Sequence, residues 1–111
     1  MKPLREQQAQ KTKEKTYKVR SEYAADFIKE LENSSELQRL IIESAKAGLS
    51  KAIVIPNKPI NIEGLPASKA LIKKLENEGY KTEWVEQVLE AKDKKNILGE
   101  DIIYRALHIR W

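Results

Sequence analysis

Residues 51–89, KAIVIPNKPINIEGLPASKALIKKLENEGYKTEWVEQVL, contain the pattern from which the fold is predicted. The β-branched run 51–55 is typical of a short buried strand. Pro66 suits the first turn of a helix over 66–78, where its missing N–H costs nothing. The alternation over 80–89 indicates a second strand. Strand, helix and strand form a βαβ unit, whose right-handed crossover makes the strands parallel neighbours or near-neighbours.

Two helical stretches precede this unit. Ser21 is a candidate N-cap, and apolar residues follow it at helical spacing until Asn33-Ser34-Ser35 interrupts them. Ser35 and Gln38 have the spacing of a capping box, and Gly48 stands where a left-handed C-cap is expected. The two stretches can form one kinked helix or two short helices.

A third strand is predicted over 102–111, after a polar loop that begins at Glu90. It should pair antiparallel with the strand before it. The fold class is therefore α+β with a βαβ core: a three-stranded mixed sheet with two to three helices packed on one face.

The net charge of +4 is unevenly distributed. Residues 1–20 hold seven bases and two acids, a net of +5, which leaves residues 21–111 with a net charge of −1. We predict a basic flexible arm over 1–20, disordered or a frayed helix, and a single α/β domain over 21–111. The arm is either a solvated tail or a contact to nucleic acid phosphates through Lys11, Lys13, Lys15, Lys18 and Arg20.

The residues that catalysis commonly uses are scarce. There is no cysteine, and no phosphate-binding loop or dinucleotide fingerprint is present. His108 is the one histidine, and its neighbours on the predicted strand face, Ala106 and Arg110, would not orient it as a base. We therefore predict a non-enzymatic protein with no cofactor and no metal. No apolar run is long enough for a membrane helix, so we expect a cytoplasmic protein with no membrane partner.

Both faces of the predicted third strand carry large apolar or aromatic groups, so the face away from the helices should also meet a partner. The partner can be a second copy, giving a homo-oligomer (a dimer or higher) through the sheet or its edge. Alternatively, the face is a binding platform for a ligand or partner protein, formed by Tyr80, Trp84, Tyr104, His108 and Arg110.

About two-thirds of the chain resembles small α/β accessory proteins encoded by bacteriophages and prophages. The resemblance rests on Ala45-Lys46-Ala47-Gly48, Ile53-Val54-Ile55, Leu75-Glu76-Asn77-Glu78-Gly79-Tyr80 and His108-Ile109-Arg110-Trp111. The long basic arm and the proline-rich loop depart from it. The resemblance implies a protein of the host cytoplasm that binds and inhibits a host component, or an oligomer that sequesters a small nucleotide. It carries no catalytic residues.

Overall fold

The computed structural model describes residues 4–111, with side chains from Gln8 onward. Three helices and three strands follow one another in the order α1 (Leu4–Asn33), α2 (Glu36–Lys46), β1 (Lys51–Val54), α3 (Pro66–Asn77), β2 (Lys81–Leu89) and β3 (Ile102–Arg110). The α+β class is confirmed. The strands lie within a residue or two of their predicted limits.

The sheet has the strand order β1-β3-β2, and β3 is antiparallel to both neighbours. The predicted mixed sheet is therefore wrong. The strands of the βαβ unit do point the same way, but β3 lies between them, so each hydrogen-bonded pair is antiparallel. The central strand β3 is buried on both faces over the run from Ala106 to Ile109, which suits a strand with a neighbour on each side.

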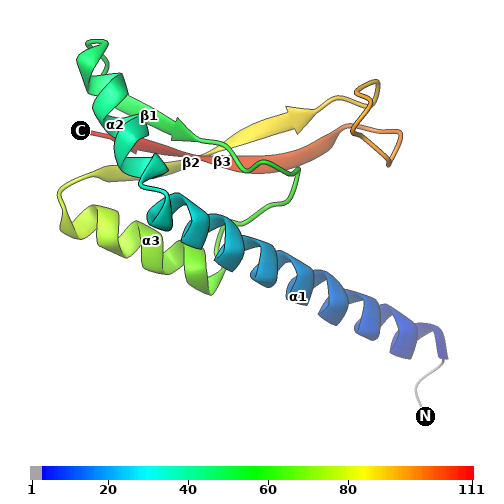
Figure 1. The fold of residues 1–111 in the computed structure, drawn as a ribbon. Helices are drawn as coiled ribbons and strands as arrows, with labels where there is room; N and C mark the ends of the chain where they lie inside the picture. The colour runs from blue at the N-terminus through cyan, green and yellow to red at the C-terminus, as the bar shows by residue number, and fades with distance from the viewer. Residues whose placement is uncertain (1–3) are drawn as a thin grey trace.

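All three helices pack on one face of the sheet, as predicted (Figure 1). The main core joins residues from the three helices to residues from β1 and β3, and Trp84 of β2 packs against it. Its buried members are Ile28, Leu31, Leu37, Val54, Leu71, Leu75, Leu107 and Ile109. A smaller cluster of Ala24, Ile62 and Leu65 fixes the loop between β1 and α3 against α1.

Helix α1 is continuous across the predicted boundary between arm and domain, and Ser21 is not an N-cap. The arm is rich in Lys, Glu and Gln, and no glycine or proline interrupts the helix from Leu4 to Asn33, so the backbone stays helical. Residues 8–19 are nevertheless exposed, and Arg20 is the first residue after them that is partly buried. Figure 1 shows this half of α1 projecting beyond the other helices. Residues 1–3 of the predicted arm lie outside the described part of the chain.

The two N-terminal helical stretches are separate helices. Ser35 adopts a left-handed conformation at φ 56° and makes no side-chain capping bond, so the predicted capping box does not form. At the other end of α2, the N–H of Leu49 donates to Ser44 O and the N–H of Gly48 donates to Ala45 O, and each N···O distance is 3.0 Å. This is a Schellman motif, and Gly48 at φ 81° supplies the left-handed residue that it needs.

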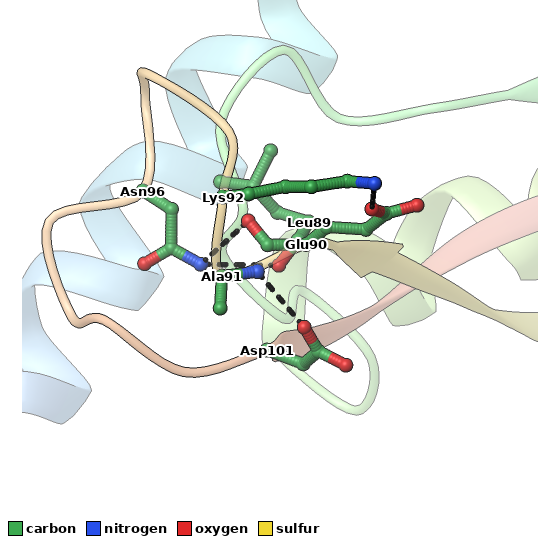
Figure 2. A network of polar contacts seen from close by, with 6 residues as sticks. All are labelled: Leu89, Glu90, Ala91, Lys92, Asn96 and Asp101. Carbon is green, nitrogen blue, oxygen red and sulfur yellow. Dashed lines mark hydrogen bonds and ion pairs between the residues drawn. The ribbon is translucent and has the colours of Figure 1, made fainter.

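One side chain organises the loop that joins β2 to β3. Asn96 Nδ2 donates to the carbonyl oxygens of Leu89, Glu90 and Glu100, over 2.7 to 3.1 Å. Figure 2 shows Asn96 directed at the end of β2, with the Ala91 N–H donating to Asp101 nearby. Asn96 Oδ1 also accepts from the Leu98 and Gly99 N–H groups. The hydrogen bonds of the Asn96 side chain to the loop backbone thereby stabilise one conformation of this polar loop.

Replacing Asn96 with alanine should destabilise this loop. The substitution removes five contacts, and with partial replacement by water it should lower the free energy of unfolding by about 1–3 kcal/mol. Urea unfolding measures the change. Asp93→Ala in the same loop removes a single bond to the Lys95 N–H and is the matched control. Equal effects of the two substitutions would contradict the organising role of Asn96.

Candidate functional site: the open face and the distal hairpin

The strand register decides which side chains face the helices. Trp84 pairs with Leu107 and Thr82 with Ile109, and this set faces the helices because Trp84, Leu107 and Ile109 pack in the core. The alternate residues form the opposite surface, which we call the open face. Its members are Lys51 and Ile53 from β1, Lys81, Glu83, Val85, Gln87 and Leu89 from β2, and Ile102, Tyr104, Ala106, His108 and Arg110 from β3.

The sheet is narrower at its far end. Strand β1 pairs with β3 only from Leu107 to Arg110, so β2 and β3 continue as a two-stranded ribbon. We call Val88–Ile103, the strand ends and their loop, the distal hairpin. Figure 1 shows it projecting away from the three helices. A two-stranded ribbon with no further cover is only marginally stable in water.

The distal hairpin exposes large aliphatic side chains on one face and at its tip. Val88 and Ile103 lie on the helix side of the sheet, yet each is more than half exposed. At the tip, Ile97 is 98% exposed and Leu98 60%. Leu89 and Ile102 on the open face are half-buried. Since Asn96 orders the loop, these apolar groups are held in place rather than free to fold back.

The opposite end of the open face is cationic. Arg110 of β3 has Lys51 of β1 directly opposite on one side and Lys81 of β2 on the other. We call these three residues the cationic row. Glu83 Oε2 lies 2.5 Å from Arg110 Nη2 and neutralises one of the three charges.

His108 lies next to the cationic row, opposite Ile53 and Glu83. It is 9% exposed, and its buried Nδ1 has no hydrogen-bond partner in the part of the chain that the structure describes. Burial lowers the pKa of His108 below its ordinary value of 6.5, and the charges of Lys51 and Arg110 lower it further, against the opposing effect of Glu83. The ring is therefore neutral at physiological pH.

The five residues of the predicted platform do not share one surface. Tyr104, His108 and Arg110 lie on the open face, whereas Trp84 faces the helices and packs on the core. Tyr80 also packs against the core, and its ring meets that of Trp111 edge-to-face at 6.1 Å. Sequence reasoning missed Lys51 and Lys81 because only the register places them beside Arg110, and it treated Ile97 and Leu98 as part of a polar loop.

The predicted arm residues lie along α1. Lys11, Lys15 and Lys18 follow a spacing of four and three residues and so share one side of the helix. Lys13 and Arg20 lie on the other side, and Arg20 Nε donates to Asn61 O over 2.8 Å. A shallow groove separates this part of α1 from residues 59–61.

Within residues 4–111, no helix is both long and apolar enough to cross a membrane. No group of three or more possible metal-ligating side chains gathers in the described part of the chain. Comparison with models of protein families, with curated proteins and with solved structures finds no match.

The low pKa of His108 should make stability depend on pH. The unfolded chain takes up the proton near pH 6.5, whereas the folded chain takes it up at a lower pH. Stability is therefore fully present above the unfolded pKa and decreases as pH falls through it. Urea unfolding at about pH 7.5 and about pH 5.5 measures the loss, a range in which histidine is the side chain that titrates. His108→Gln should reduce this dependence, and an unchanged dependence in that variant would refute the assignment.

Proposed function

We propose that this protein is a non-enzymatic binding protein that forms a homodimer through the distal hairpin. The observation that supports the proposal is the set of exposed aliphatic side chains at the tip and on one face of an ordered, projecting hairpin: Val88, Ile97, Leu98 and Ile103. Ordered apolar protrusions of this kind mark interaction surfaces. A phage origin and a host protein partner stay predictions from the sequence resemblance.

A second copy is the occupant that the hairpin favours. Within residues 4–111, the edge of β3 that faces β1 has no partner strand from Ile102 to Ala106, and the outer edge of β2 has none along its whole length. An unpaired edge offers backbone N–H and C=O groups that another extended strand can satisfy. An antiparallel pairing of one hairpin with its copy is a two-fold contact, in which the same residues serve both subunits. It also brings the apolar groups of both copies together.

The expected affinity follows from the apolar surface available. Completing the burial of four aliphatic side chains that are half to fully exposed contributes roughly 1–2 kcal/mol each, so the two copies together contribute about 8–16 kcal/mol. Association itself costs an estimated 4–15 kcal/mol. The two ranges overlap, so we expect a reversible dimer whose population depends on protein concentration, rather than an obligate one.

Ile103→Glu should shift the protein to monomer, because it places a charge in the middle of the proposed contact. Leu49→Glu is the matched control, since Leu49 is 58% exposed against 59% for Ile103 and lies at the end of α2, outside the distal hairpin. Sedimentation equilibrium over a range of concentrations measures the mass. The wild-type protein and the control should both show the dimer.

Three results would refute the dimer: a wild-type protein that is monomeric at every concentration, equal loss of dimer in both variants, or a dimer that survives Ile103→Glu. Leu98→Glu at the loop tip provides a second variant of the hairpin if Ile103→Glu lowers the folded fraction. Circular dichroism of each variant establishes that the comparison is made between folded proteins.

The arm supports a second candidate function, association with nucleic acid. Lys11, Lys15 and Lys18 present three charges along one side of an exposed helix, which matches the requirement for contacts to successive phosphates. Specific base contacts have no support in the described residues.

The triple variant K11E/K15E/K18E should weaken binding to a short DNA duplex about tenfold or more and flatten its salt dependence. Fluorescence anisotropy at several salt concentrations measures both. K46E/K69E/K73E carries the same change of charge on exposed positions of α2 and α3 and serves as the control. No binding by the native protein, or equal weakening in the two triple variants, would reject this function.

A further inference from the structure

The cationic row places like charges where a sheet disfavours them. Residues directly opposite on neighbouring strands have side chains on the same face, and adjacent strands lie about 4.8 Å apart. Lys51, Arg110 and Lys81 occupy three such positions in succession. Like charges directly opposite one another lower the stability of a sheet. The row is thus a feature that the fold alone does not favour.

The chain compensates this charge only in part. Glu83 pairs with Arg110, but among the described side chains no carboxylate lies within ion-pair distance of Lys51 or Lys81. Among the side chains at this end of the open face, three cations and one carboxylate leave an excess of two positive charges. Because both lysines are exposed on flexible stems, they can converge on a group bound between them.

One further feature lies beside the row on the open face. His108 lies within the electrostatic reach of Lys51 and Arg110 and holds a neutral ring with one N–H donor. Trp111 follows Arg110 but lies on the other side of the sheet, where its ring meets that of Tyr80, which packs against the core. Cations and a neutral donor therefore meet at one end of the open face.

We propose that Lys51, Arg110 and Lys81 form a binding site for a phosphate-class anion carrying at least two negative charges. The anion would bridge the two lysines and the Arg110 guanidinium on the open face. This site lies at the opposite end of β3 from the distal hairpin, so it does not depend on the proposed dimer. Free pyrophosphate and a nucleoside diphosphate share the required chemistry.

The sole histidine makes the test direct, because its ring gives one set of NMR signals. Titration of the full-length protein with pyrophosphate should shift the His108 signals saturably. A bound anion beside the ring should also raise the pKa of His108 relative to the free protein. The double variant K51Q/K81Q should weaken pyrophosphate binding about tenfold or more, since it removes two charged partners.

K69Q/K73Q carries the same loss of charge on exposed positions of α3 and should bind like the native protein. Absence of a saturable His108 shift, or equal weakening in the two double variants, overturns the site. Parallel titrations with ADP identify the source: tighter binding than pyrophosphate indicates a nucleotide, and equal or weaker binding a free anion. Repeating the titration with Ile103→Glu separates this site from the dimer, because a folded monomer should still bind pyrophosphate.

A second readout follows from the repulsion within the row. Without ligand, K51Q/K81Q should unfold at a higher temperature than the native protein, because two like-charge neighbours of Arg110 are gone. With pyrophosphate, the native protein should gain more in unfolding temperature than K51Q/K81Q at the same ligand concentration. A double variant that is less stable than the native protein without ligand would show that the lysines have a structural role instead.

Discussion

The insertion of β3 between β1 and β2 is the interaction on which the remaining structure depends. Its backbone bonds to both neighbours fix the register, and the register decides the face of every side chain in the sheet. Leu107 and Ile109 reach the core by this pairing, while His108 and Arg110 are turned to the open face. A shift of one residue would exchange the two sets and leave the helices against charged groups.

The unequal lengths of the flanking strands divide β3 into two parts with different surroundings. Near Arg110 it has a neighbouring strand on each side, and the cationic row lies across all three strands. Near Ile102, within the described residues, it has one neighbouring strand, and the aliphatic side chains of Val88 and Ile103 are more than half exposed. The two proposed binding surfaces arise from this asymmetry along a single strand.

Local signals predicted most elements well. Pro66 and Gly79 delimit α3 through backbone chemistry that acts within a few residues, and β-branched runs located the strands. The predictions that failed needed information from distant parts of the chain. The strand order depends on which strands pair with β3, and these lie far from it in the sequence or on the opposite side of a loop. The helix α1 begins earlier than predicted because residues that favour a helix continue on both sides of Ser21. The residues of the candidate site were the least predictable, since Lys51 and Lys81 become neighbours of Arg110 only through pairing across the whole sheet.

The position of β3 also constrains the order in which the molecule can assemble. Lys51 pairs with Arg110, and most of the described chain lies between them, so closing β1 onto the sheet carries the entropy cost of a long loop. Helices α1, α2 and α3 and strand β2 all precede β3 in the chain and leave a ribosome before it. Until β3 arrives, β1 has no partner strand and the apolar sides of the helices have no complete sheet to cover. During synthesis the apolar residues of the helices are therefore open to other proteins until β3 completes the core.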